Sequence, residues 1–239
     1  MKRPLVVGYK GEIGRFILAG LLKTMPKALD IFCVDKNEST GEVISRIKKS
    51  DVIFLCVPFD RTIWWLVKYA KHLKGKIVVE QTSLKNWAFA MDLKKEFPSV
   101  KFMHMHILFR PSETPNVLDR RVVIVGNINK LQDRHFYDTY HVIAQITESQ
   151  IQLCSSITNH DNMMAVHQTL THRVVVRLAD EIRKLPHKTF ISNKIVELAD
   201  RIIRGGELTK HLQTNPNKYE VVHQFAQNLS TEPLFYKEQ

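Results

Sequence analysis

Short apolar runs alternate along the first 126 residues with longer segments in which apolar positions recur every three or four residues. The runs predict buried strands, and the periodic segments predict helices that pack on them. The expected strands are residues 4–8, 30–35, 51–58, 76–81, 100–106 and 121–126, and the expected helices are 12–24, 42–49, 61–73 and 86–96. This alternation predicts an α/β fold with a doubly wound, mainly parallel sheet.

The pattern changes after about residue 150. From residue 157 onward only helical periodicity remains, and the expected helices are 158–184, 189–204 and 216–228. Pro186 and the pair Gly205-Gly206 stand where the first two helices should end. The sequence therefore predicts two domains, an α/β domain over 1–150 and an all-helical C-terminal domain over 151–239.

A glycine turn, "LVVGYKGEIGRF" (Leu5 to Phe16), joins the first expected strand to the first helix. Gly11 stands where a chain passes close to a pyrophosphate, and Gly14 where the helix packs tightly on the strand. Gly8 lies one residue before the first glycine of the G-x-G-x-x-G fingerprint, whose place Tyr9 takes. A helix N-terminus at this point offers free N–H groups to an anion.

Asp35 ends the second expected strand, where a carboxylate accepts hydrogen bonds from the ribose hydroxyls of NAD. It would repel the 2′-phosphate of NADP, although the neighbouring Lys36 leaves NADP as the less favoured cofactor. The residues expected to contact the dinucleotide are Gly8, Tyr9, Lys10, Gly11, Ile13, Gly14, Asp35, Val57, Pro58 and Ser83. The sequence thus indicates a Rossmann-type domain that binds NAD. The alternative is a domain of this type that holds a different nucleotide or none.

Ser83 follows the fourth expected strand, in "EQTSLKN", and His106 lies at the end of the fifth, in "HMHILFRPS". Ligands of open α/β sheets bind beyond the carboxyl ends of the strands. A hydroxyl and an imidazole there suit a dehydrogenase, in which a base takes a proton from a carbinol while hydride leaves the same carbon. The alternative is that His106 and its neighbour His104 only cap the sheet.

The first helix of the C-terminal domain carries a second polar cluster, "NHDNMMAVHQTLTHRVVV" (Asn159 to Val176). An uninterrupted α-helix would place His160, Met164 and His167 on one face, and Gln168 with His172 on an adjoining one. These side chains could line a cleft, or they could belong to an ordinary amphipathic helix. We expect no metal site, because no carboxylate or cysteine completes a ligand set with clear spacing.

The formal net charge of +11 admits binding to nucleic acid or to small polyanions. The basic residues are spread along the chain and gather only in pairs, which favours a solvated surface. A hydrophobic content of 44% argues against disorder, and no apolar run is long enough to span a membrane. Three well-separated cysteines and the absence of a leader-like segment favour a cytoplasmic protein without a disulfide framework.

The sequence resembles the prephenate dehydrogenases, and most nearly the dehydrogenase part of the bifunctional chorismate mutase–prephenate dehydrogenases. Four segments carry the likeness: "VVGYKGEIGRF", "DVIFLCVP" with "VVEQTSLKN", "MHMHILFRP" and "HDNMMAVHQTLTH". The last of these matches the pattern H-D-x-x-M-A-x-x-Q-x-L-x-H, with which the family opens its helical domain. "NPNKYEVVHQ" (Asn215 to Gln224) also resembles a late helical segment of the family.

The resemblance implies oxidative decarboxylation of prephenate to 4-hydroxyphenylpyruvate in tyrosine biosynthesis, with NAD as cofactor and a homodimer formed through the helical domain. His106 would be the catalytic base, with Ser83 beside it. His160, Gln168 and His172 would shape the substrate pocket, and Arg201, or else Arg204, would bind a substrate carboxylate.

The chain departs from the family's H-P-M-x-G segment, since Ile107 replaces the proline and Arg110 the glycine. We hypothesise that Arg110 supplies a cation to the dianionic substrate. Alternatives are an arogenate dehydrogenase and another two-domain NAD(P)-dependent hydroxyacid dehydrogenase or imine reductase. A non-enzymatic protein that binds a dinucleotide or nucleic acid is the least favoured.

Overall fold

The computed structural model describes residues 3–25, 30–86, 93–112, 116–126, 134–205 and 212–231. The chain divides into two compact units, Met1–Ile157 and Thr158–Gln239. The expected boundary at residue 150 precedes this division, because one further strand follows it in the first unit.

The described part of the first unit contains a seven-stranded sheet in the order β2-β1-β3-β4-β5-β6-β7. The strands are β1 (Pro4–Val7), β2 (Phe32–Val34), β3 (Val52–Leu55), β4 (Ile77–Glu80), β5 (Lys101–Ile107), β6 (Arg121–Val125) and β7 (Gln150–Cys154). β1 to β5 pair in parallel, β6 is antiparallel to β5, and β7 is parallel to β6. The carboxyl ends of β1 to β5 therefore meet at one edge of the sheet, where Rossmann-type folds bind ligands.

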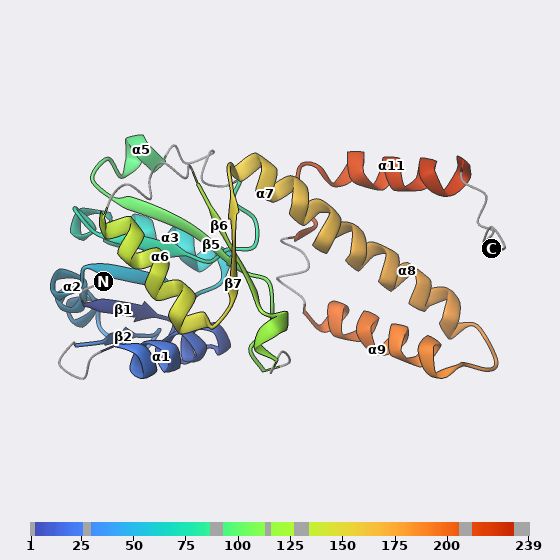
Figure 1. Ribbon diagram of the computed structural model, residues 1–239, viewed down its shortest axis with the longest axis horizontal. Coiled ribbons are helices and arrows are strands. Elements are labelled where there is room, and N and C mark those ends of the chain that lie inside the picture. Colours follow the sequence, from blue (N-terminus) through green and yellow to red (C-terminus); the bar gives the residue numbers. More distant parts are fainter. Residues whose placement is uncertain are drawn as a thin grey trace. The chain divides into compact units, whose positions relative to one another are not determined.

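Helices cover the two faces of this sheet (Figure 1). They are α1 (Glu12–Thr24), α2 (Thr40–Lys49), α3 (Phe59–Tyr69) with the 3-10 turn η1 (Ala70–His72), α5 (Leu93–Glu96) and α6 (Arg134–Thr147). A further 3-10 turn, η2 (Val117–Asp119), lies in the connection that leads into β6. β1, β3 and β4 are buried at every position, because helices lie on both of their faces. This explains why their sequences read as continuous apolar runs rather than alternating ones.

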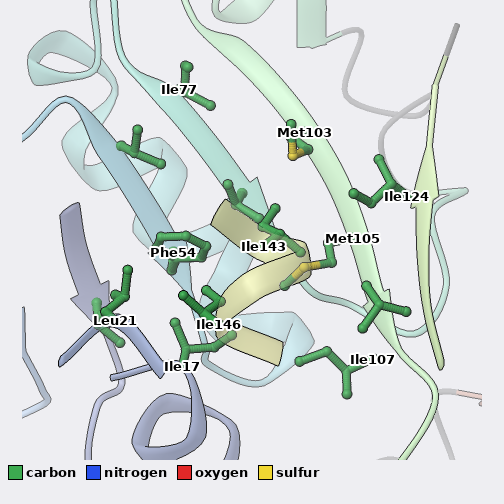
Figure 2. Close-up of a cluster of buried hydrophobic side chains, with 14 of the residues drawn as sticks. Ile17, Leu21, Phe54, Ile77, Met103, Met105, Ile107, Ile124, Ile143 and Ile146 are labelled. Atoms are coloured by element: carbon green, nitrogen blue, oxygen red, sulfur yellow. The ribbon is translucent and has the colours of Figure 1, made fainter. Parts of the chain in front are cut away.

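Two apolar clusters fill the layers between the sheet and its helices. In Figure 2, Ile17 and Leu21 of α1 and Ile143 and Ile146 of α6 face the inward side chains of the central strands. From β5, this cluster receives Met103, Met105 and Ile107. Because side chains of a strand alternate between faces, His104 and His106 lie on the opposite face of β5 from these three residues.

The second unit contains α7 (Ile157–Met164), the π-helical segment η4 (Ala165–Leu170), α8 (Thr171–Arg183), α9 (Phe190–Arg204) and α11 (Lys218–Thr231). The first three form one continuous helix, drawn in yellow and light orange in Figure 1. α8 and α9 pack side by side through Ala179 and Ile182 of one helix and Ala199 and Ile202 of the other. Arg183 of α8 also forms an ion pair with Asp200 of α9.

The structure confirms the expected fold class, a mainly parallel Rossmann-type sheet followed by helices. Neither α6 nor β7 was predicted from the sequence. β7 is an edge strand with an exposed or half-buried residue at every position, so it lacks the apolar run that marked the other strands. Part of the helix expected over 86–96 falls outside the described residues, and its described portion is α5.

Candidate active site

The turn after β1 is shaped by Gly8, whose φ of 78° lies in the left-handed region that favours glycine. A Cβ atom there would lie 2.5 Å from the carbonyl oxygen of Cys56 and 2.8 Å from Val57 Cγ1. Gly8 N–H donates to Val34 O at 2.8 Å, and Gly11 N–H donates to Gly8 O at 3.0 Å. On the other side, Cys56 N–H after β3 donates to Val7 O at 2.9 Å, so the start of the turn is held between β2 and β3.

Gly14 brings α1 against this turn. A Cβ atom at Gly14 would lie 2.1 Å from Gly8 O and 2.7 Å from Tyr9 Cα. The Tyr9 side chain is half-buried and packs against the same apolar cluster as Ile13. Tyr9, which stands at the first glycine position of the G-x-G-x-x-G fingerprint, therefore packs in the same apolar layer as α1.

The first turn of α1 carries no side-chain cap from its N-cap residue, Gly11. Its leading N–H groups are therefore left for another acceptor, which is the arrangement that binds phosphate in Rossmann folds. Glu12 in this turn accepts hydrogen bonds from Ser112 N at 3.1 Å and Ser112 Oγ at 2.6 Å. Its other oxygen lies 3.5 Å from Arg110 Nε. The loop after β5 is thus fastened to the start of α1.

The carboxylate of Glu12 lies at the start of α1, and its place beside the glycine turn was not predicted from the sequence. Partial burial alone would raise its pKa, but the hydrogen bonds from Ser112 and the charge of Arg110 lower the pKa below its ordinary value. Glu12 therefore stays ionised beside the exposed guanidinium of Arg110, which the structure places near the glycine turn.

Asp35 lies just beyond β2, and both of its carboxylate oxygens are engaged. Oδ2 accepts a hydrogen bond from Lys10 N at 3.0 Å, and Oδ1 accepts one from Lys36 N at 2.8 Å. The carboxylate is thereby held against the glycine turn, and each oxygen can accept a further hydrogen bond. The ammonium of Lys10 lies 5.6 Å from the centroid of the Tyr9 ring.

The half-buried side chain of Gln81 lies at the carboxyl ends of β3 and β4. Gln81 Nε2 lies 2.9 Å from Cys56 Sγ, whereas Gln81 Oε1 is buried without a hydrogen-bond partner among the described residues. Burial raises the pKa of the Cys56 thiol to about 12, so the thiol stays protonated. Val57 and Pro58 follow Cys56, and Pro58 is the N-cap of α3. An unpartnered buried oxygen next to the glycine turn is a site where a ligand could donate a hydrogen bond.

Ser83 lies in the loop after β4, and His106 is the penultimate residue of β5. His106 is only 3% exposed, and Ser83 is half-buried. Ile107 continues β5 to its end and packs in the apolar cluster of Figure 2. The structure therefore places both predicted catalytic residues at the carboxyl ends of adjacent strands.

A charge network around a fully buried ion pair ties the ends of β4 and β5, which carry these two residues, and no sequence pattern indicated it. Lys85 Nζ lies 2.6 Å from Glu80 Oε1, and both side chains have no exposed surface. His104 Nδ1 lies 2.8 Å from the same carboxylate oxygen. Burial alone would raise the pKa of Glu80, but the charge of Lys85 and the hydrogen bond from His104 lower this pKa to about 2.

In the second unit, the π-helical segment changes which residues share a face. A π-turn holds more residues than an α-turn, so side chains beyond it are rotated relative to an uninterrupted helix. His160 and Met164 are buried, as an apolar face requires, but His167 is exposed. The expectation that these three residues share a face is therefore wrong.

Two buried polar atoms near this segment lack partners among the described residues, Gln168 Oε1 and His172 Nδ1. Burial lowers the pKa of His172 and so favours its neutral form. His160, by contrast, is paired: its Nδ1 lies 2.8 Å from Asp161 Oδ1. Asn215 Nδ2 donates to the Asp161 carbonyl at 2.8 Å. Gln168 and His172 thus have the open hydrogen-bonding capacity of ligand-binding residues, whereas His160 has a structural partner.

Arg201 and Arg204 are exposed in the last turn of α9. No described helix is long and apolar enough to cross a membrane. Within the described ranges, no group of three or more His, Cys, Asp or Glu side chains could hold a metal ion.

The fold and the glycine turn define a class, the Rossmann-type proteins with a helical second part. Comparison with solved structures narrows this class. Prephenate dehydrogenase from A. aeolicus, solved with hydroxyphenyl propionate and NAD+, superposes with a TM-score of 0.75 at 15% identity, over 96% of this chain and 88% of that one. A candidate prephenate dehydrogenase from Corynebacterium glutamicum gives 0.68 at 14% identity, over 99% and 84%.

A third similar structure is the imine reductase from Myxococcus stipitatus in complex with NADP+. Its TM-score is 0.55 at 14% identity, over 95% of this chain and 78% of that one. No protein-family model matches the sequence, and no curated protein matches it. The chain thus has the fold of the prephenate dehydrogenases, and the resemblance noted in its sequence is confirmed at the level of fold.

Proposed function

We propose that this protein is an NAD-dependent prephenate dehydrogenase, which converts prephenate to 4-hydroxyphenylpyruvate and carbon dioxide. One observation carries the proposal. A buried imidazole, His106, stands at the carboxyl edge of the same parallel sheet whose first turn has the backbone of a pyrophosphate site. The similar structure from A. aeolicus, which holds NAD+ and a hydroxyphenyl compound, supports both parts of this assignment.

The first unit has the features that a nicotinamide dinucleotide requires. The uncapped N–H groups of α1 would hold its pyrophosphate, and Asp35 would accept hydrogen bonds from a ribose. Gln81 Oε1 offers a buried acceptor that nothing described in the chain satisfies. We favour NAD over NADP because two carboxylates make the ribose end of the site acidic: that of Asp35, and that of Glu38, whose Oε2 accepts a hydrogen bond from Asp35 N at 2.6 Å. The cofactor supplies the hydride acceptor.

The chain's own residues would handle the proton and the substrate. His106 accepts the proton of the ring hydroxyl as the carbinol carbon is oxidised, and Ser83 contacts the same hydroxyl. Loss of the ring carboxylate as carbon dioxide then makes the ring aromatic, so the reaction needs neither a metal nor a strong acid. Gln168 and His172 are the best-supported pocket residues, because each has a buried atom without a partner in the described chain. His160 shapes the pocket through its pair with Asp161.

Cationic side chains would recognise the substrate's two carboxylates. Arg201, or else Arg204, is the proposed ligand in α9, because both are exposed at its last turn. Arg110 remains a second candidate, although its guanidinium lies beside Glu12. This carboxylate would have to share Arg110 with the substrate.

The test compares purified wild type with His106→Asn and with His167→Asn, an exposed histidine that serves as the matched control. NADH formation is followed with prephenate and, separately, with arogenate. We expect prephenate oxidation in the wild type, a fall in kcat of about 100-fold to 10,000-fold in His106→Asn, and little change in His167→Asn. The affinity for NADH, measured by fluorescence, should stay within about threefold, since His106 is not assigned to cofactor binding.

Near-normal turnover in His106→Asn would contradict the role of His106. A strong preference for arogenate would replace the proposed substrate but keep the reaction class. If neither substrate yields NADH while NADH still binds, the protein has another activity at a dinucleotide site.

We also propose that the protein forms a homodimer through its helical unit and works in the cytoplasm. The exposed apolar residues of that unit include Leu178, Leu185, Phe190, Ile191 and Ile203. Apolar exposure on this scale suits a partner surface. All three cysteines are free thiols, which fits a reducing compartment. Sedimentation of the purified protein decides the oligomeric state, and a monomer at micromolar concentration would contradict the dimer.

A further inference from the structure

Lys85 is one of the largest side chains with no exposed surface in the described chain, and it belongs to the same loop after β4 as Ser83. Its Nζ lies 2.6 Å from Glu80 Oε1 and donates a hydrogen bond to the Met105 carbonyl at 2.7 Å. A single ammonium thus joins the end of β4, the loop that follows it, and β5. The proposed reaction assigns no proton transfer to this group.

The loop after β4 is wrapped around the Glu80 carboxylate. Thr82 N donates to Glu80 Oε2 at 2.9 Å, and Thr82 Oγ1 lies 2.5 Å from the same oxygen. Lys85 contacts the other carboxylate oxygen. Ser83 therefore lies between two residues, Thr82 and Lys85, that are both held by one buried carboxylate.

β5 is tied to the same carboxylate just before His106. His104 and Glu80 face each other in the parallel register of β4 and β5, and His104 Nδ1 lies 2.8 Å from Glu80 Oε1. An ionised carboxylate only accepts hydrogen bonds, so His104 Nδ1 carries the hydrogen. Together with the bond from Lys85 to Met105, this anchors both residues that precede His106.

The network has no evident role as a source of stability alone. Removing two charges from water is costly, and buried ion pairs can often be replaced by apolar residues of similar volume without loss of stability. An apolar pair cannot reproduce directional hydrogen bonds. The ammonium of Lys85 bonds to one particular carboxylate oxygen, Glu80 Oε1, and to one particular carbonyl, that of Met105. The value of Lys85 therefore lies in fixing the position of the groups around it.

We propose that Lys85 is a positioning residue, whose buried ammonium holds the loop of Ser83 and the strand of His106 in one fixed relation. This inference rests on the proposed function, since it assumes that Ser83 and His106 meet the substrate. It predicts that loss of the tie impairs the chemical step more than the binding of cofactor.

The test uses four variants. Lys85→Met removes the ammonium and leaves Glu80 buried without it. Glu80→Gln keeps an acceptor for Lys85 and keeps the bond from Lys85 to Met105. The double variant Glu80→Gln/Lys85→Met removes both charges. Lys76→Met is the matched control, because Lys76 Nζ bonds to the carbonyls of Lys48 and Ser50 at the opposite end of β4.

We expect Lys85→Met to lose about 100-fold in kcat, the loss typical of a misplacement near 1 Å. Its Tm should fall by about 10 °C, because a charge is left buried without its partner. The double variant should recover most of the Tm but not the kcat. Glu80→Gln should lower kcat less than Lys85→Met does, because it keeps the bond from Lys85 to Met105 but replaces one acceptor oxygen of the carboxylate by an amide NH2. Lys76→Met should lower Tm without lowering kcat. The Kd for NADH should stay within about threefold in all variants.

A double variant that regains wild-type kcat together with Tm would overturn the proposal, because Lys85 would then matter only for stability. So would an unchanged kcat in Lys85→Met. If the wild type has no activity with prephenate or arogenate, the proposed function fails first, and the geometry is tested by NMR of the His106 imidazole. We then expect its ring signals to shift in the double variant and not in Lys76→Met. Unshifted signals in the double variant would overturn the inference.

Discussion

Gly14→Ala tests whether the contact between α1 and the turn after β1 builds the dinucleotide site. The added methyl group would lie 2.1 Å from the carbonyl oxygen of Gly8 and 2.7 Å from Tyr9 Cα. Ordinary contact begins at 3.4 Å. The obstructing atoms belong to the backbone, so no side chain can rotate away, and α1 must move outward by roughly 1 Å.

Two effects follow from this displacement. Overpacking of this kind costs about 1–3 kcal/mol of the free energy of unfolding. The same movement carries the first N–H groups of α1 away from the position of a pyrophosphate, which weakens charge-assisted hydrogen bonds worth about 1.5–3 kcal/mol each. We therefore expect the Kd for NADH to rise at least about tenfold.

The assay pairs thermal unfolding with a fluorescence titration of NADH, and Gly41→Ala provides the control. Gly41 lies near the start of α2, just as Gly14 lies near the start of α1, but a Cβ atom at Gly41 would meet nothing within 4 Å. Gly41→Ala should stabilise the protein by about 0.5 kcal/mol and leave the Kd unchanged. Wild-type Tm and Kd in Gly14→Ala would refute the reasoning, because α1 would then tolerate displacement from the turn.

Two further predictions concern charge. Asp35→Ser should reduce the preference for NADH over NADPH by at least about tenfold, because it removes the carboxylate that accepts hydrogen bonds from a ribose and repels a 2′-phosphate. The ratio of the Kd values for NADH and NADPH measures this preference, and an unchanged ratio would refute the assignment of Asp35. Glu80 should make the free energy of unfolding depend on pH in the acid range, because its folded pKa of about 2 lies below the ordinary value of 4.5. Its contribution to the free energy of unfolding, about 3 kcal/mol, is fully present above pH 4.5 and is lost as the pH falls towards 2. Urea unfolding of the wild type and of Glu80→Gln/Lys85→Met at a series of pH values checks this, and parallel stability curves for the two proteins below pH 4.5 would contradict it.

The parts of the fold that could be predicted were those whose burial leaves a local pattern. β1, β3 and β4 are buried on both faces, so their sequences are apolar without interruption. β7 is a largely exposed edge strand, and its mixed sequence gave no comparable signal. The candidate site followed the same division. Gly8, Gly14 and Asp35 could be identified because their spacing along the chain reflects a local strand–turn–helix geometry.

The network of Glu80, Lys85 and His104 could not be identified in this way. Glu80 ends an apolar strand and Lys85 lies in a polar loop, and neither position alone indicates burial. Their contact with His104 depends on the register of β4 against β5, which pairs residues that are distant in sequence. The π-helical segment is a similar case, because it rotates His167 away from His160 although the local pattern is typical of an uninterrupted helix.

The sequence by itself thus determined the alternation of strands and helices, the glycine turn, and the positions of His106 and Ser83 at strand ends. These features depend on hydrophobic periodicity and backbone preferences that act over a few residues. Only the tertiary structure decided which buried polar groups find partners. Glu80 and Lys85 pair with each other. Gln81, Gln168 and His172 each keep one buried atom without a partner among the described residues. Hydrogen bonding and desolvation of a buried group depend on what lies around it in space, and sequence spacing does not specify that.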